Sequence, residues 1–479
     1  MAQWEETYRC QPSDVSVRGA KDFPLTGCDQ LMRWVHVRTT VYYPLSNSTK
    51  ISRGNIVQLL KSGLEKLASQ LPCLTATLVL DPVSKRGTAS TIGSDDGILF
   101  LVAGSDTVRT DLPSYAELER GRFAPWKVPR SKIYPDDNGK SLIASQGQDS
   151  ALPASIFQLS FIEGGLILTG GFHHFVVDGP SMDLIFRAWA AHCQGHTVPL
   201  HTDRSFLLSS KKPDLSELVE LERALTARGC KVESTKPDPN NPWSNLRMAP
   251  TKSAIISLSH KRITALKAEI IAQEPSTPVS TSDCLHAICW TGVTRAKAAL
   301  AENEEEKDSW TNFPITFRSR RIPEFPKNFI GNSTFLNGAV LPIEKLKAPD
   351  GPHYAALALR RLIENVDAAY LADGITWVNS LEKPATLSWV TNPPGKMDTL
   401  FTSWAGLTPY QNWDFGFGLP TALRAPEPII PLVFLLPAKT NADGEISLEV
   451  HMACTEETHK LLMKDTEFLR YTTDYYLED

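Results

Sequence analysis

The chain has 479 residues, more than the ~250–300 beyond which one hydrophobic core usually divides, so its length predicts two domains. Its hydrophobic content of 42% is ordinary for a globular protein, and a net charge of −5 is small for this length and argues against a nucleic-acid-binding surface. We expect no signal peptide, because the start Met-Ala-Gln-Trp-Glu-Glu has no charged-then-apolar pattern. We expect no membrane span, because no apolar run reaches the required ~18–20 residues.

The eight cysteines are scattered, with no C-x-x-C pair, which indicates reduced thiols in a cytoplasmic protein rather than a disulfide framework or a zinc site. His192, Cys193 and His196 lie close together in the sequence. Gly195 is expected to end a helix between them, and no carboxylate has a suitable spacing. A structural role is therefore favoured, and we expect no metal site.

The first part of the chain predicts strands together with an amphipathic helix. Residues 35–43 are rich in β-branched and aromatic residues, which indicates a strand. Apolar residues recur on one helical face in 55–68, which predicts an amphipathic helix. Further strands are predicted at 74–80, 98–103 and 155–162.

A histidine-rich turn organises the rest of the chain. The short apolar segment 165–169 indicates a buried strand, and the apolar stripe in 181–193 predicts a helix. Between them, residues 170–180 read Gly-Gly-Phe-His-His-Phe-Val-Val-Asp-Gly-Pro. Pro180 suits a first helical position. Side chains on such a strand-to-helix turn project from a rigid base, close to where a ligand can bind.

His174 is the candidate acid–base group on this turn, because an imidazole can take and return a proton near neutral pH. Asp178 is placed either to orient the ring or to hold the turn by pairing with a basic group elsewhere. Gly179 allows a backbone angle that a side chain would resist. A structural alternative stays open, with Asp178 as a helix N-cap and with His173 and His174 as hydrogen-bonded core residues.

The periodic pattern weakens between about 202 and 252, and residues 236–242 are a cluster of structure-breaking residues. We place the crossover between domains at 211–252. This leaves a first domain at 1–210, which carries the histidine turn, and a second at 253–479.

The second half predicts a helix at 279–298, a strand at 313–318 and late strands at 429–436 and 446–452. The glycine-rich stretch 414–418 (Asp-Phe-Gly-Phe-Gly) matches neither a dinucleotide-binding fingerprint nor a P-loop, and by itself it indicates a turn. No G-x-S-x-G motif supports a serine hydrolase.

Two of these motifs together resemble the paired signatures of the BAHD acyltransferases, H-x-x-x-D and D-F-G-W-G. The first is His174 to Asp178, followed by Gly179, and the second is residues 414–418, where Phe417 replaces the usual tryptophan. Other stretches agree in the family's order with its L-S-x-x-D, D-x-R-x-R, Y-x-G-N and T-S-W segments: Leu25-Thr26-Gly27-Cys28-Asp29-Gln30, Arg318-Ser319-Arg320, Phe329-Ile330-Gly331-Asn332 and Thr402-Ser403-Trp404. Thr316 stands where the family often has aspartate.

The double histidine also resembles the H-H-x-x-x-D-G motif of peptide-synthetase condensation domains, which belong to the same superfamily and join carrier-bound acyl groups to amines. The D-F-G-F-G and T-S-W stretches favour the BAHD family. The resemblance implies an α/β fold of two chloramphenicol-acetyltransferase-like domains, with mixed β-sheets flanked by helices. An active-site channel runs between the domains, with the histidine turn near its middle.

The resemblance also implies roles for single residues. His174 would act as general base, while Asp178 would point away from the substrate and hold the turn through a salt bridge to Arg318. Structural roles are implied for Asp414, Gly416 and Gly418. Candidates for contact with substrate or acyl-CoA are His173, Thr402, Ser403 and Trp404, with a donor among the last three placed to steady the developing oxyanion.

The implied reaction is acyl transfer from acyl-CoA to a hydroxyl, without an acyl-enzyme and without a permanently bound cofactor. We expect acetyl-CoA as donor, because acetyl is common in the family and Ser333 stands where malonyl-transferring members often have cysteine. The expected acceptor is a bulky secondary metabolite, and the enzyme is expected to be a cytoplasmic monomer. The alternatives are a condensation-type enzyme and a non-catalytic binding protein of the same fold.

Overall fold

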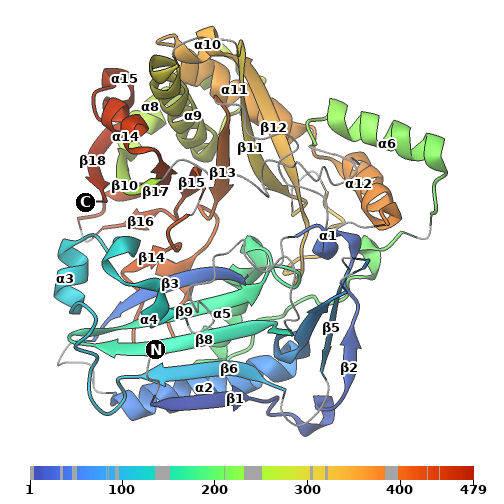
Figure 1. Cartoon of the computed structure of the whole chain (residues 1–479), viewed down its shortest axis with the longest axis vertical. Helices are drawn as coiled ribbons and strands as arrows, with labels where there is room; N and C mark the ends of the chain where they lie inside the picture. The colour runs from blue at the N-terminus through green and yellow to red at the C-terminus, as the bar shows by residue number, and fades with distance from the viewer. Residues whose placement is uncertain are drawn as a thin grey trace.

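A computed structural model of the chain describes residues 5–32, 36–45, 51–81, 83–84, 86–91, 96–134, 151–209, 211–230, 251–301, 306–318, 322–382, 397–428, 430–441 and 443–478. Within these residues the strands form sheets of six, eight and four strands (Figure 1). The first two sheets each pack against helices, which confirms the predicted α/β class with mixed sheets flanked by helices.

The first sheet carries the histidine turn and has the order β1-β6-β8-β9-β3-β14. Its strands are β1 (Glu6–Cys10), β6 (Ile98–Ala103), β8 (Ser155–Ile162), β9 (Gly165–His173), β3 (His36–Pro44) and β14 (Ala422–Arg424). Every residue of β8 and β9 is buried, as in central strands that are covered on both faces. β9 pairs antiparallel with both β8 and β3, which fixes the position of the turn that follows His173.

Two helices pack together beside this sheet, α2 (Arg53–Gln70) and α5 (Gly179–Cys193). They cross closely at Gly63, where an added Cβ would lie 2.5 Å from the Cys193 sulfur. The Trp189 indole donates to the carbonyl oxygen of Leu60 at 3.0 Å. The last turns of α5, which begins just after the histidines, are thereby packed against α2.

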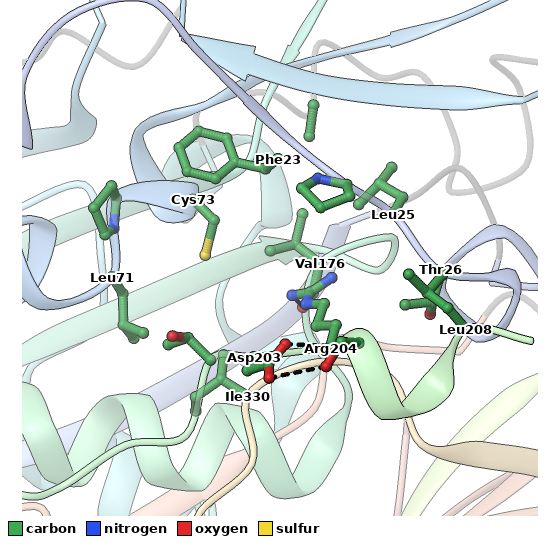
Figure 2. Close-up of a pocket in the computed structure, with 15 residues that line it drawn as sticks. Phe23, Leu25, Thr26, Leu71, Cys73, Val176, Asp203, Arg204, Leu208 and Ile330 are labelled. Carbon is green, nitrogen blue, oxygen red and sulfur yellow. Dashed lines mark hydrogen bonds between the residues drawn. The ribbon is translucent and has the colours of Figure 1, made fainter.

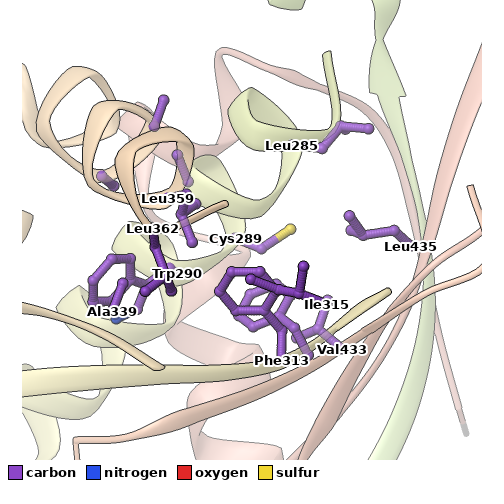
Figure 3. Close-up of a cluster of buried hydrophobic side chains, with 14 of the residues drawn as sticks. Leu285, Cys289, Trp290, Phe313, Ile315, Ala339, Leu359, Leu362, Val433 and Leu435 are labelled. Carbon is purple, nitrogen blue, oxygen red and sulfur yellow. The ribbon is translucent and has the colours of Figure 1, made fainter. Parts of the chain in front are cut away.

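The second sheet has the order β12-β11-β13-β15-β17-β10-β18, with β16 pairing to β17. Its strands are β12 (Thr334–Pro342), β11 (Asp308–Thr316), β13 (Thr399–Ser403), β15 (Leu432–Leu435), β17 (Ile446–Cys454), β10 (Lys252–Ser259), β18 (Thr472–Leu477) and β16 (Lys439–Thr440). Around it lie α8 (His260–Gln273), α9 (Thr281–Leu300), α10 (Ile343–Lys347), α11 (Gly351–Glu364), α14 (Glu456–Leu462) and α15 (Thr466–Leu469). Figure 3 shows the core between α9, α11 and the sheet, where Trp290 and Phe313 are buried.

The third sheet is small and lies beside the first, in the order β2-β5-β4-β7. Its strands are β2 (Lys21–Phe23), β5 (Gly87–Thr91), β4 (Thr77–Leu80) and β7 (Leu152–Pro153). The remaining helices are α1 (Gly27–Gln30), α3 (Tyr115–Arg120), α4 (Arg130–Ile133), α6 (Leu215–Ala227), α12 (Ala368–Ser380) and α13 (Pro409–Asn412), with short 3₁₀ turns η1 (Val15–Val17), η2 (Pro72–Thr75), η3 (Pro125–Lys127) and η4 (Ser205–Leu207).

The late chain returns to the first sheet. Ala422 of β14 pairs with Tyr42 of β3, and Figure 1 shows the orange β14 beside the blue β3. Trp413, Phe415 and Leu423 belong to the hydrophobic core of the first half. The two halves are therefore interleaved, and the site between them is built from both.

Most predicted elements agree with the structure to within a few residues, and two details differ. The predicted strand 74–80 is half a 3₁₀ turn, because Pro72 starts η2 and only Thr77–Leu80 pairs as β4. Arg318 follows β11 instead of lying in it. The breaker cluster 236–242 and residues 319–320 lie outside the described residues.

No described helix is long and apolar enough to cross a membrane.

Candidate active site

The histidine turn connects the last residue of β9, His173, to the first residue of α5, Gly179. The His173 carbonyl accepts hydrogen bonds from the main-chain N–H groups of Val176, at 2.9 Å, and Val177, at 3.3 Å. Asp178 has extended backbone angles and caps α5, because its Oδ1 accepts from the Ser181 N–H at 2.9 Å. The predicted role of Asp178 as helix N-cap therefore does not exclude its predicted role of holding the turn by pairing with a basic group.

The structure corrects the reason given for Gly179. Its φ is not in the positive region that favours glycine, unlike those of Gly416 and Gly418. A Cβ at Gly179 would lie 3.9 Å from Cδ1 of Trp404, an ordinary contact. Neither backbone strain nor a close contact therefore requires glycine at this position.

The ring of His174 is partly exposed, and its Nδ1 is buried without a hydrogen-bond partner among the described residues. Burial lowers the pKa of His174 below its ordinary 6.5, while nearby carbonyl groups and the Asp178 carboxylate offset part of this effect. The imidazole is therefore neutral at pH 7. A neutral ring on a rigid turn has the protonation state that a general base requires.

His173 has different surroundings, although it is adjacent in sequence. Its ring is fully buried, its Nδ1 accepts from the Phe175 N–H at 3.2 Å, and its edge meets the ring of His36 at a centroid distance of 5.4 Å. Burial and the neighbouring histidines hold its pKa well below the usual value. These contacts favour a role in shaping the turn over the predicted contact with substrate.

Asp178 faces Arg318 from the second half of the chain, and Arg318 Nη1 donates to Asp178 Oδ2 at 2.7 Å. Both side chains are largely buried, with 3% of Asp178 and 15% of Arg318 exposed. Burial alone would raise the pKa of the Asp178 carboxyl, but the Arg318 guanidinium and hydrogen bonds from Ser181 hold it below its ordinary value. The carboxylate is ionised and paired, and it holds the turn.

Arg318 is itself held by several acceptors. Its Nη2 donates to the carbonyl oxygens of Phe329 and Gly331, both at 3.0 Å, and to the Ser181 hydroxyl at 2.9 Å. Thr316, which replaces the family's usual aspartate, still accepts from the Arg318 main-chain N–H at 3.2 Å. A charged partner is therefore not needed at position 316 to fix this arginine.

The second glycine-rich motif forms a turn beyond the other end of α5. Asp414 Oδ1 accepts the main-chain N–H groups of Gly416, at 2.7 Å, and Gly418, at 3.0 Å. Both glycines have positive φ, +101° and +108°, which side chains rarely adopt. The Asp414 carbonyl accepts from Gln194, the C-cap of α5. The motif lies away from the histidines and contacts the opposite end of their helix.

The T-S-W segment ends β13 and reaches the turn through its tryptophan. Trp404 is buried next to Gly179, and its main-chain N–H donates to the Leu435 carbonyl at 2.8 Å. Thr402 is partly buried, whereas Ser403 is exposed. Of the three candidates, Trp404 is the one placed directly against the first residue of α5.

Several side chains that hold the turn are not among the site residues that the sequence predicts. Asn332 Nδ2 donates to the His174 carbonyl at 2.8 Å, and the Ser333 N–H donates to Asp178 Oδ2 at 3.1 Å. Ser181 bonds to both Asp178 and Gly331. Arg204 had no signal in the sequence, because it follows α5 in an irregular segment without a motif.

A pocket of about 310 Å³ lies beside the same turn. Figure 2 shows Val176, Arg204 and Ile330 on its wall, with Phe23 and Leu71 among the apolar side chains around them. His174 and Asp178 do not line it. The pocket therefore borders the segments that support the turn and is separate from the candidate base.

His192, Cys193 and His196 lie at and just after the end of α5. Within the described residues, no three histidine, cysteine, aspartate or glutamate side chains are grouped so as to hold a metal ion. His192 instead hydrogen-bonds to Gln70 Oε1 at 2.9 Å. These contacts favour the structural role expected for His192.

Comparison with known proteins shows which family the chain belongs to. A family model described as the Transferase family matches residues 3–469. The acyltransferase easC of Emericella nidulans is 26% identical, with 92% of this chain and 93% of the relative covered. The trichothecene 3-O-acetyltransferase TRI101 of Fusarium sporotrichioides is 24% identical, with 91% of this chain and 93% of the relative covered.

Among solved structures, TRI101 of F. graminearum, complexed with coenzyme A and T-2 mycotoxin, matches with a TM-score of 0.77 and 18% identity, covering 95% of this chain and 99% of that one. This likeness confirms the predicted two-domain fold. The family match spans nearly the whole chain. The protein therefore belongs to the Transferase family, the family of the BAHD acyltransferases, and it is an acyltransferase.

Proposed function

We propose that the protein transfers an acetyl group from acetyl-CoA to a hydroxyl of a bulky secondary metabolite, with His174 as general base. The observation that carries this proposal is the state of His174: a partly exposed, neutral imidazole on a turn held by the buried pair Asp178 and Arg318. The names of the relatives support acetyl and hydroxyl as the groups involved, since two of the matched proteins are TRI101 acetyltransferases.

In the proposed reaction, His174 takes the proton from the acceptor hydroxyl as its oxygen attacks the thioester carbonyl carbon. The tetrahedral intermediate collapses with cleavage of the C–S bond, and the imidazolium returns its proton to the departing thiolate. Proton and acyl group are both accounted for, so no acyl-enzyme and no resident cofactor are required. General-base help of this kind typically contributes about 10²–10⁴-fold in rate.

Asp178 is proposed to act through the turn rather than on the substrate. Its two carboxylate oxygens are occupied by Arg318, Ser333 and the Ser181 N–H. A carboxylate used in this way has no free position for the acceptor. We also propose that the enzyme works as a monomer and is cytoplasmic, the latter supported by its eight free cysteines.

The test is an assay of thiol release from acetyl-CoA with a panel of polycyclic alcohols, combined with intact-mass detection of the product. A mass gain of one acetyl group on the alcohol, with one equivalent of free thiol, is the expected result. Activity only with a carrier-bound acyl group would favour the condensation-type alternative. If an alcohol binds and slows the release of coenzyme A, but no acetyl group passes from acetyl-CoA to that alcohol, the result would favour a non-catalytic binding protein.

A further inference from the structure

A second buried carboxylate lies at the turn, and the proposed mechanism does not use it. Asp29 is completely buried in α1. Its Oδ2 accepts from Arg204 at 2.8 Å and from the main-chain and side-chain donors of Thr26. Its Oδ1 accepts both the main-chain N–H and the side-chain Nδ2 of Asn332, at 3.2 and 2.9 Å. Because both carboxylate oxygens of Asp29 accept several hydrogen bonds, the side chains that donate them are held in fixed positions.

Two of the side chains that bond to Asp29 also contact the histidine turn. Both Asn332 and Arg204 donate hydrogen bonds to main-chain carbonyls there. Asn332 Nδ2 bonds to the carbonyl oxygen of His174 at 2.8 Å. Arg204 Nη2 bonds to the carbonyl oxygen of Val176 at 3.1 Å. The carbonyls of two alternate turn residues are thus held by side chains that Asp29 orients.

Gly331 makes room for this arrangement. Its φ is +148°, and an added Cβ would lie 3.2 Å from Arg204 Nε and 2.7 Å from the ring of Phe329. Residues 331 and 332 therefore come close to Arg204 and Asp29 only because position 331 has no side chain. Ser333, the next residue, bonds to Asp178, so one short segment contacts both ends of the turn.

We propose that Asp29, Arg204 and Asn332 form a second clamp that positions His174 through the main-chain carbonyls of the turn, in addition to the clamp made by Asp178 and Arg318. Asp178 and Arg318 hold the end of the turn that enters α5, and the second clamp holds the end that leaves β9. The inference rests on the proposed role of His174 as base. Displacement of a reacting group by 1 Å costs about 10²-fold in rate, which sets the expected size of the effect.

The first test compares Asn332→Leu with Asn337→Leu. Both asparagines are completely buried, and Asn337 lies in β12, where it bonds to the Phe335 carbonyl and to Tyr370. Both variants lose buried hydrogen bonds and lose stability, but only Asn332 touches the turn. Asn332→Leu is expected to lower kcat by about 10²-fold with KM for acetyl-CoA unchanged, and Asn337→Leu is expected to keep kcat.

The pH profile separates positioning from general loss of stability. The Asn332 side chain, whose Nδ2 donates to the main-chain carbonyl of His174, raises the pKa of that residue, so its removal is expected to shift the acid limb of kcat/KM to lower pH. The charged and titratable groups around His174 are His173 on β9, Asp178 at the N-cap of α5, Arg318 after β11, and the Asp29 and Arg204 pair. None of them is changed in Asn332→Leu or Asn337→Leu. An equal loss of kcat in both variants, or an unshifted acid limb in Asn332→Leu, would overturn the inference.

Arg204→Ala supplies a second test that does not depend on the folding of the Asn332 variant. Arg204 lines the pocket in Figure 2, so truncation opens a path from solvent to Asp29. Millimolar guanidinium is expected to restore kcat of Arg204→Ala, while sodium at the same ionic strength is not. No loss of kcat in Arg204→Ala, or a loss that guanidinium leaves unchanged, would contradict the clamp.

His174→Ala is measured alongside these variants. If it keeps normal kcat, the proposed role of His174 is wrong, whatever the clamp variants do. If it is inactive while Asn332→Leu behaves like Asn337→Leu, the proposed function stands and only the clamp is wrong.

Discussion

Arg318 Nη1 lies 2.7 Å from Asp178 Oδ2, although 140 residues separate the two in sequence. This ion pair joins the first turn of α5 to the segment after β11, and thus joins the two halves of the chain. The Asp178 carboxylate also lies close enough to His174 to act on its pKa. The pair makes the geometry of the turn depend on how the two halves pack.

We predict that Asp178→Ala and Arg318→Ala each lower the free energy of unfolding by ~3–5 kcal/mol, because each leaves a buried charge without its partner. Asp178→Asn is expected to be milder, since it keeps the shape and some hydrogen bonds. The double alanine variant is expected to lose less than the sum of the single losses. Chemical denaturation of all four variants measures this, and strictly additive losses would exclude the coupling.

The lowered pKa of His174 predicts the pH dependence of activity. The neutral form is the base, and burial holds the folded-state pKa below 6.5. The acid limb of kcat/KM is therefore expected below pH 6.5, with full activity at pH 7. A profile of kcat/KM between pH 4.5 and 8 checks this, and an acid limb above pH 6.5 would show that the ring is stabilised in its charged form.

Two buried histidines in the second half predict a loss of stability in acid. Burial lowers the pKa of both His286 and His451 to about 3. Because these folded pKa values lie below the unfolded 6.5, the stability that the neutral rings contribute is fully present above pH 6.5 and falls as the pH drops below it, by about 1.4 kcal/mol per unit for each histidine. Unfolding free energies at pH 7.5 and 5.5 measure this fall.

His451→Phe is the matched variant for that effect. Both ring nitrogens of His451 are buried without a hydrogen-bond partner among the described residues, and its ring stacks on Phe434. Phenylalanine keeps the stack and cannot bind a proton. We expect unchanged or higher stability at pH 7.5 and a smaller loss at pH 5.5. A marked loss of stability at pH 7.5 would show that the nitrogens are bonded.

Alanine substitutions at two glycines are expected to differ. Gly416 has a φ of +101°, so Gly416→Ala places a side chain in strained backbone at a cost of about 1–3 kcal/mol. Gly179 has no such angle, and its Cβ would make only an ordinary contact with Trp404. Thermal unfolding should show a lower Tm for Gly416→Ala and little change for Gly179→Ala. Equal shifts would mean that crowding at Trp404 matters as much as strain.

The sequence predicts those helices, strands and turns that are determined by neighbouring residues in the chain. The apolar run of β9 and the apolar stripe of α5 predicted the strand, the turn and the helix, although β9 extends four residues beyond the predicted 165–169, to His173. The pairing of Asp178 with Arg318 came from the resemblance, since no periodicity connects residues so far apart. In contrast, periodicity misplaced the start of β4, because Pro72 and the following turn broke an apolar run that resembled one strand.

The second clamp was beyond sequence reasoning for a physical reason. Asp29 meets Asn332 across 303 residues and Arg204 across 175. Asp29 and Asn332 were noticed as motif members, but their contact depends on how the first and second sheets pack. Likewise, Gly331 was quoted in a motif, while the close approach of Arg204 that requires a glycine there is visible only in three dimensions.

The most direct test of the account is kcat of His174→Ala with acetyl-CoA and the acceptor found in the thiol-release assay, measured beside binding of coenzyme A and thermal unfolding. The account predicts a loss of kcat of about 10²–10⁴-fold, with the coenzyme A Kd and Tm close to those of the unchanged protein. A variant that folds, binds coenzyme A and keeps near-normal kcat would contradict the assignment of His174 as the base.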